Sequence, residues 1–383
     1  INFGQDSTFA GNKTAQGNTD GGGIGDFYYA VPSGFKALCS ANLPDPSIKL
    51  PNKHFDTLLY TGSNSSSLYN VTGLEFQPDW VWGKARNDTI GNIVFDAVRG
   101  EDKQLETDIT DAEVVRSSAA YRFLSNGFAV STVGNLNNPV NYVAWNWNAG
   151  GSTVTNNDGS ITSSVRANTT AGFSIVSYTG NATSGATVGH GLGVAPKVLI
   201  VKERGNTNNW PVYHAEIGNT KALYLDLTND SGGAFTGAWN NTSPTSSVFS
   251  LGNSNETNRS SGNFITYCFS EVAGYSKFGK YTGNGNADGT FVFTGFRPAF
   301  VIFKYASGSA QWNTRDIARD TYNPTEKYLL PSDSGAEGTS SHKIDFLSNG
   351  FKHRGTGAAF NSSGGTYIYL AFAESPFKNS RAR

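Results

Sequence analysis

The chain has 383 residues, a length at which two or three domains are expected rather than one. Only 15% of the residues are charged, and 29 basic against 30 acidic side chains give a net charge of −1, which excludes a basic surface for nucleic acid. With 45 glycines, 13 prolines and 13% aromatic residues, the composition is typical of a turn-rich β protein that can fill a core, not of a disordered chain.

The N-terminus, the apolar runs and the two cysteines show no motif for membrane insertion, metal binding or redox activity. The sequence starts at Ile1 and contains no methionine, so we expect the translated N-terminus to lie upstream. No apolar run approaches the ~20 residues of a membrane span, so no membrane insertion is predicted. Cys39 and Cys268 lack the spacing of metal or redox motifs. Two free, buried thiols are predicted, with a disulfide bridge as the alternative.

From residue 55 onward, one sequence unit occurs three times. Each copy opens with Tyr-Thr-Gly, continues to a proline that begins an apolar run ending in lysine, and closes with an aromatic strand. The lysine stands six residues after the proline in every copy, and the first and third copies also share the segment Phe-Leu-Ser-Asn-Gly-Phe. The copies begin at Tyr60, Tyr178 and Tyr281, their runs span 78–84, 196–202 and 298–304, and their closing strands span 142–147, 264–269 and 367–372.

A unit of about 100 residues is long enough to enclose a core of its own. We therefore predict three separate domains in a bead-like array, with a linker rich in Gly, Ser, Thr and Asn after the first. The predicted boundaries are an N-terminal segment 1–54, repeat 1 at 55–149, the linker at 150–170, repeat 2 at 171–277, repeat 3 at 278–378 and a C-terminal tail at 379–383.

The pattern within a unit is that of β-strands. Side chains alternate along a strand, so Trp80 and Trp82 should share one face, whereas runs such as 198–201 are apolar on both faces, as in a covered central strand. The stretch 101–120 has loosely helical spacing, but its counterparts in the other copies alternate like strands, so we predict no helix there. The prediction is an all-β chain of three antiparallel, jelly-roll-like sandwiches.

A few polar and aromatic side chains recur at equivalent places and are candidates for ligand binding. An aspartate with an arginine three residues later can hold a sugar or another chain, or can form a structural ion pair. A tryptophan before it can stack on a sugar or pack in a core. The second copy has a histidine in place of the aspartate and lacks the arginine, so chemistry shared by all copies is not expected. The candidates are Asp96, Arg99, Trp210, His214, Trp312, Asp316 and Arg319.

Motifs for catalysis or metal binding are not recognised in the sequence. The histidines have no partner at the spacing of a metal site, and the turns 156–159 and 286–289 fit either calcium ligation or ordinary turn chemistry. Neither a Ser-His-Asp pattern nor a phosphate or dinucleotide loop is found. We predict that the protein is not an enzyme and has no metal and no cofactor.

The repeated pattern, running into Ala-Glu-Ser-Pro-Phe-Lys at 373–378, resembles a repeat module of tail and virion-surface proteins of marine bacteriophages. The resemblance covers about 55–378. Residues 1–54, with Pro-Ser-Gly-Phe at 32–35, are similar to the closing segment of the SPRY-type, concanavalin-like sandwich that often precedes such modules.

This resemblance implies a virion structural protein at the virion surface, a tail fibre or tail-associated protein used for adhesion to the host. The implied partners are other virion proteins, identical chains in a trimer, and a host-cell glycan or protein. The alternatives are a decoration or knob protein of the capsid head and, from another class, a polysaccharide depolymerase.

Overall fold

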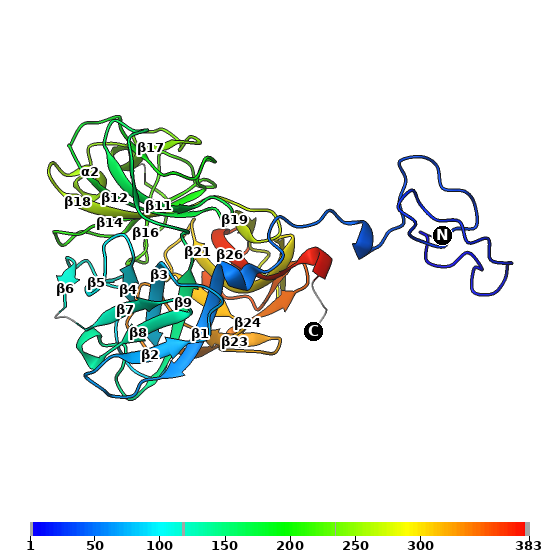
Figure 1. Cartoon of the computed structure of the whole chain (residues 1–383), viewed down its shortest axis with the longest axis horizontal. Helices are drawn as coiled ribbons and strands as arrows, with labels where there is room; N and C mark the ends of the chain where they lie inside the picture. Colours follow the sequence, from blue (N-terminus) through cyan, green and yellow to red (C-terminus); the bar gives the residue numbers. More distant parts are fainter. Residues whose placement is uncertain (1–2, 117–118, 234, 380–383) are drawn as a thin grey trace.

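The computed structural model describes residues 3–116, 119–233 and 235–379. These residues form a body of three β-sandwiches, and an arm, residues 3–46, extends away from it (Figure 1). The body consists almost entirely of antiparallel strands, with only short helical turns between them, which confirms the predicted all-β, multi-sandwich class.

The first sandwich packs a large sheet against a small one, with a cluster of buried side chains around Phe95, Tyr121 and Phe128 between them. Its large sheet has the order β1 (Phe55–Thr61), β9 (Asn141–Trp147), β3 (Trp80–Ala85), β4 (Ile93–Asp96), β5 (Lys103–Glu106) and β6 (Val114–Val115). Its small sheet has the order β2 (Tyr69–Thr72), β8 (Gly127–Val130) and β7 (Tyr121–Leu124). The stretch 101–116 is thus not helical, as predicted.

The second and third sandwiches are built in the same way around clusters of their own. The second has a large sheet of β10 (Val154–Asn156), β11 (Ser163–Asn168), β12 (Phe173–Thr179), β18 (Asn263–Phe269), β14 (Val198–Glu203), β15 (Pro211–His214) and β16 (Leu223–Tyr224), and a small sheet of β13 (Ala186–Gly189) and β17 (Val248–Leu251). The third has β19 (Ser276–Thr282), β26 (Thr366–Pro376), β21 (Phe296–Tyr305) and β22 (Asn313–Asp316), facing β20 (Asp288–Phe293), β25 (Gly350–Arg354), β24 (Gly338–Leu347) and β23 (Thr325–Tyr328).

Helical turns of three or four residues lie before, between and after these strands. They are η1 (Ser40–Asn42), η2 (Pro51–Lys53), η3 (Thr132–Gly134), α1 (Thr236–Trp239), α2 (Asn255–Asn258), α3 (Ala358–Asn361) and η4 (Phe377–Asn379).

All three large sheets share one connectivity. The strand that carries Tyr-Thr pairs with the closing strand of its repeat, which in turn pairs with the strand after the proline: β1-β9-β3, β12-β18-β14 and β19-β26-β21. The next strand along the chain, β4, β15 or β22, follows in the same direction across each sheet. One folding unit is therefore present three times in the chain.

The Tyr-Thr-Gly signature marks a close approach between two chain segments. The tyrosine hydroxyl donates to a backbone carbonyl in the loop before the closing strand, at Leu136 (2.9 Å), Thr257 (2.6 Å) and Phe360 (2.9 Å) in the three repeats. At the glycine the same loop lies so near that a Cβ at Gly62 would collide with the carbonyl oxygen of Asn138. The signature therefore fixes the loop that leads into each closing strand.

Replacing Gly62 by alanine should destabilise the protein by about 1–3 kcal/mol, because the backbone of Asn138 must shift to accept the methyl group. Urea denaturation measures this change. Gly205→Ala is the control, since a Cβ there meets nothing within 4 Å. Equal midpoints for both variants would contradict the account of the signature.

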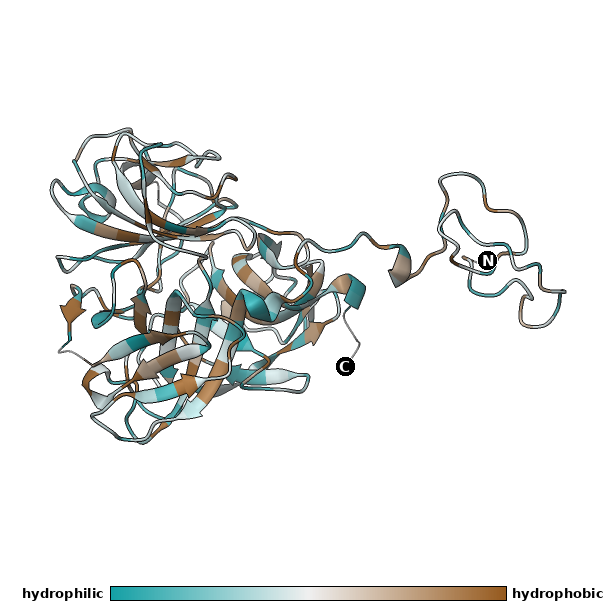
Figure 2. Cartoon of the chain, viewed as in Figure 1, coloured by the Kyte–Doolittle hydropathy of each residue, from teal (hydrophilic) through white to brown (hydrophobic). Residues whose placement is uncertain are grey.

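The bead-like array is wrong, because the three sandwiches share one core. The outer faces of the three large sheets, apolar as the sequence shows, turn toward each other and form a single buried cluster with members from every repeat. Its aromatic members include Trp80 and Trp147 from repeat 1, Phe269 from repeat 2, and Phe300 and Phe372 from repeat 3. Figure 2 shows apolar residues along the strands of the body. The indole pairs of β3 and β9 lie on this shared side, as alternation predicts.

Two further expectations are corrected. The segment 150–170 is not a linker: it supplies β10 and β11 to the large sheet of the second sandwich, because its alternating Val154 and Val165 pair across these strands. Cys39 is exposed on the arm, whereas Cys268 is buried, and both are free thiols. Of the predicted tail 379–383, only Asn379 lies within the described residues, where it ends η4.

The arm, residues 3–46, is held by turns rather than by sheets. The Asp20 carboxylate accepts backbone N–H groups of Ala37 (3.0 Å) and Ile24 (3.0 Å), and these hydrogen bonds lower the pKa of Asp20 to about 2. Phe3, Phe9, Tyr29 and Phe35 line a hollow of about 310 Å³ on the arm. Tyr29 is 77% exposed.

Candidate functional site

The seven side chains selected from the sequence as ligand-binding candidates lie inside the molecule. Asp96, Trp210 and His214 are 0% exposed, Trp312 and Asp316 are 1% exposed, and Arg99 and Arg319 are 3% exposed. None of them is available at the surface of the chain, and the structure shows the alternative that the sequence left open for them, buried ion pairs and core packing. They are located at the three junctions where one repeat meets the next.

The junction of repeats 1 and 2 is built on Asp96, at the end of β4. Its carboxylate accepts Arg99 Nε (2.5 Å) from the same turn and the Tyr267 hydroxyl (2.8 Å) from repeat 2. Glu113 then pairs with Arg99 (3.2 Å) and with Arg204 of repeat 2 (2.8 Å). A chain of alternating charges thus crosses this junction.

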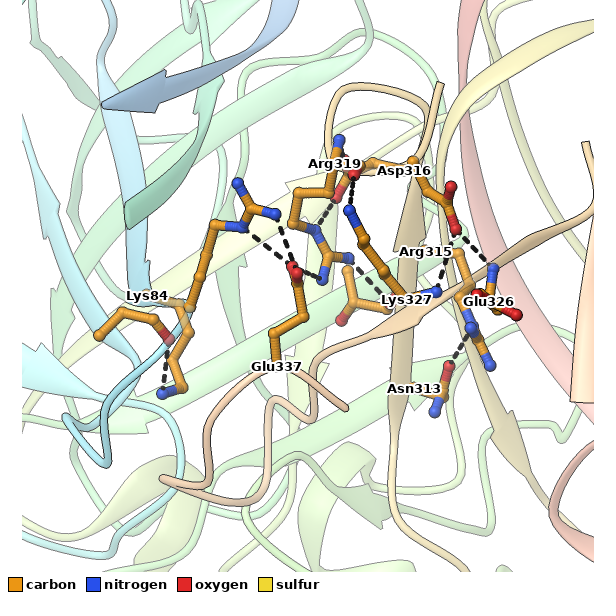
Figure 3. Close-up of polar contacts among 12 residues, drawn as sticks. Lys84, Asn313, Arg315, Asp316, Arg319, Glu326, Lys327 and Glu337 are labelled. Atoms are coloured by element: carbon orange, nitrogen blue, oxygen red, sulfur yellow. Dashed lines mark hydrogen bonds and ion pairs between the residues drawn. The ribbon is translucent and has the colours of Figure 1, made fainter. Parts of the chain in front are cut away.

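Repeats 3 and 1 meet through the equivalent chain of contacts (Figure 3). Asp316, at the end of β22, accepts Arg319 Nε (2.6 Å) and the indole N–H of Trp145 (3.1 Å) from repeat 1. Glu337 pairs with Arg319 (3.1 Å) and with Arg86 of repeat 1 (2.9 Å). Arg86 and Glu337 are distant in sequence, so this junction closes the three repeats into a ring.

The junction of repeats 2 and 3 keeps the backbone geometry but not the buried charges. Ser231 N donates to Ala306 O (2.8 Å), as Glu113 N does to Arg204 O (2.8 Å) and Glu337 N to Arg86 O (2.6 Å). Leu370 stands where Tyr267 and Trp145 supply donors in the closing strands of the other repeats.

If position 214 held an aspartate, its carboxylate would find neither a hydrogen-bond donor at Leu370 nor an arginine three residues later. His214 instead faces the carbonyl of Tyr369 (3.4 Å) with Nε2. The charges at this junction include the partly exposed Lys280–Glu216 pair (3.2 Å) and Lys304, which Asp230 attracts.

The two candidate tryptophans also connect neighbouring repeats. Trp210 donates its indole N–H to Glu106 O (3.0 Å) of repeat 1, and Trp312 donates to Tyr224 O (2.7 Å) of repeat 2. Asn92 occupies the matching place in repeat 1 and donates to Asp333 O of repeat 3 (2.9 Å). Core packing, with a hydrogen bond to the neighbouring repeat, is thus what these positions share.

Sequence reasoning missed the residues that connect the junctions, namely Arg86, Arg204, Glu113 and Glu337. A signal for the arginines was present, since Lys-x-Arg ends the post-proline run of the first two copies, whereas the third copy has Ala306. The glutamates lie in loops whose sequences do not repeat, so no pattern identifies them.

Two buried histidines predict how the stability depends on pH. Burial lowers the pKa of His214 to about 4 and that of His353 to about 3. In the unfolded chain both titrate near 6.5, so below that pH the unfolded state binds more protons and the free energy of unfolding falls. His214 alone accounts for a loss of about 3 kcal/mol by pH 4.

The test compares the wild type with His214→Gln by urea denaturation between pH 7 and 4.5. Asp79, whose pKa is raised to about 7 by burial, shifts both curves in the opposite direction, so the difference between the two proteins is the informative quantity. The wild type should lose more stability than the variant as the pH falls. Parallel curves would show that His214 does not titrate in this way.

The remaining candidates are explained by local structure. Asp158 N donates to Asn156 Oδ1 (2.9 Å) within the first acidic turn, and Asp288 of the second pairs with Lys352 (3.0 Å) and Arg354 (2.8 Å). Within the described ranges, no group of three or more His, Cys, Asp or Glu side chains is placed to hold a metal ion. None of the helices in the described part of the chain has the length and apolar character needed to cross a membrane.

Comparison with known protein families gives a match over most of the chain. The model of a family described as "Domain of unknown function (DUF7483)" matches residues 50–376, which comprise the whole ring of three repeats. No curated protein matches the chain, and no solved structure does.

Proposed function

Since the chain belongs to the DUF7483 family, whose function is unknown, we propose from its own structure that it is a non-enzymatic structural protein of a bacteriophage virion, a tail fibre or tail-associated component that adheres to the host surface. The observation that carries this proposal is the closed ring of three sandwiches. Charged and aromatic side chains that could have formed a reactive site are used inside the junctions, where they join one repeat to the next. This is the construction of a rigid spacer.

The arm supports attachment to a larger assembly. It extends away from the body (Figure 1), and its exposed aromatic side chains form a surface of the kind that binds other proteins. Other virion proteins are the proposed partners of this surface. Further copies of the chain in a trimer, and a glycan or protein of the host, are the proposed partners of the body.

A place on the capsid head is the second candidate, and the ring favours it as well. A body made of three equivalent units matches a platform of threefold symmetry, which a fibre and a capsid axis both offer.

Immunoelectron microscopy of particles of the phage that encodes the chain tests the proposal. Antibodies against the chain should label the tail; label on the head would favour the decoration role, and particles without label would contradict both. A reducing-end assay on the host polysaccharide should stay negative with the purified chain, and released sugar would reveal the depolymerase instead.

A further inference from the structure

The third sandwich carries an open cavity of about 520 Å³, lined by both polar and apolar side chains, next to its β23–β24 pair. Two aromatic rings, Tyr328 and Phe360, form part of its wall, and Gln311, Asn313 and Ser340 bring amide and hydroxyl groups. Aromatic faces beside a few polar groups are the lining by which proteins hold sugars and other small polar ligands.

A buried arginine lies directly behind those two rings. The guanidinium carbon of Arg315, which is 0% exposed, is 5.4 Å from the ring centre of Tyr328 and 5.8 Å from that of Phe360. Its Nε donates to Asn313 Oδ1 (3.0 Å), a cavity residue (Figure 3), and its Nη2 donates to His342 O (3.0 Å). Its Nη1 is buried and has no hydrogen-bond partner.

Within the described residues, the Arg315 guanidinium forms no ion pair with a carboxylate, although Asp320 and Glu326 attract it from beyond ion-pair distance. Asp316, next in the chain, is held by Arg319 (2.6 Å), and Glu326 is paired with Lys343 (2.9 Å). Asp320 accepts the backbone N–H of Glu326 (2.6 Å). Burial and the neighbouring Arg319 lower the pKa of Arg315 to about 9, so the side chain remains a cation at neutral pH. The nearby His342 and His353 supply no negative charge.

The fold itself does not require an arginine at this place. Arg315 pairs with Val301 across β22 and β21, and the same register position holds Phe95 opposite Val81 in repeat 1 and Tyr213 opposite Leu199 in repeat 2. Both aromatic residues are members of the apolar clusters inside their sandwiches. Because an unpaired buried cation destabilises a protein, its presence in one repeat alone indicates a function specific to that repeat.

We propose that this cavity binds an acidic sugar, with the ring faces of Tyr328 and Phe360 against the sugar and the cation of Arg315 attracting its carboxylate. Because the guanidinium is buried, water and salt screen its charge less than they screen that of a surface arginine. The inference deepens the proposed adhesion function, since it names uronic-acid polymers of the host surface as the ligand class.

Isothermal titration of the full chain with an oligogalacturonate, and with the neutral oligogalactose of equal length, tests the site. The acidic oligosaccharide should bind and the neutral one should bind at least about tenfold more weakly. Arg315→Phe should weaken oligogalacturonate binding by at least about tenfold, to the level of the neutral sugar. This variant restores the residue type of repeat 1, so its thermal unfolding midpoint should stay equal or rise, which separates loss of binding from loss of folding.

Lys280→Gln is the matched charge control, because Lys280 lies on the exposed side of β19, away from the cavity lining. It should bind oligogalacturonate as the wild type does. Failure of the wild type to bind the acidic sugar, or equal binding by Arg315→Phe, would overturn this inference. Either result would leave the labelling of virus particles, and hence the proposed virion role, as a separate question.

Discussion

Replacing Asp96 by alanine should lower the free energy of unfolding by about 3–5 kcal/mol, one of the two largest effects that we expect from a single substitution. The carboxylate is the partner of Arg99 Nε at 2.5 Å and of the Tyr267 hydroxyl at 2.8 Å, both inside the junction. Without it, the guanidinium loses its main counter-charge while it remains buried. Chemical denaturation followed by tryptophan fluorescence measures the loss.

Two further variants test whether the loss in Asp96→Ala comes from the buried ion pair. Asp288→Ala removes an exposed aspartate at the start of β20 and should leave the unfolding midpoint unchanged. Asp96→Ala combined with Arg99→Met removes both charges and should recover part of the lost stability, since a buried pair replaced by apolar groups is tolerated. If Asp96→Ala unfolds like the wild type, the junction contributes little to the ring.

The second large effect is expected from Trp80→Ala, which should cost about 3–5 kcal/mol. The indole of Trp80 is 1% exposed, with ring centres 4.2 Å from Tyr267 of repeat 2 and 4.5 Å from Trp147 of its own repeat. Because these rings belong to the core shared by all repeats, the substitution should lower the stability of every sandwich.

Hydrogen exchange read by mass spectrometry follows each sandwich separately. In Trp80→Ala, peptides from the large sheets of all three repeats should lose protection together, and calorimetry should show one transition at lower temperature. Tyr322→Ala, at a site that is 80% exposed, serves as the control. Loss of protection confined to residues 55–149 would mean that the sandwiches unfold independently.

The sequence alone was sufficient to predict the all-β class and the repeated unit, but not β10 and β11, which lie in the segment predicted as a linker. Tyr-Thr-Gly and the terminal lysine recur because they meet equivalent partners inside each repeat, such as the loop carbonyls that accept from Tyr60 and Tyr178. The ammonium groups of Lys84 and Lys202 likewise donate to a carbonyl six residues further along the chain. Contacts within a unit leave a signal in every copy of the unit, and that signal can be read without coordinates.

How the repeats associate could not be predicted in the same way. Trp80 and Trp82 lie on the face of β3 that an isolated domain would expose to solvent. In the sequence, an apolar face of this kind fits either the interior of a sandwich or a surface that packs against another repeat. The connecting glutamates Glu113 and Glu337 lie in dissimilar loops. Arg315 showed no pattern at all, because the other two copies carry core aromatics at its position.

The arm joins the body on the same side as the end of the third repeat. Lys378, near the end of the described chain, donates to Leu43 O (2.8 Å) and pairs with Asp45 (2.7 Å), so both ends of the ring leave from one side, as Figure 1 shows. A tether at either end would therefore anchor the same pole of the protein. The opposite pole, made by the lobes of the first two repeats, would point outward whichever end is fastened.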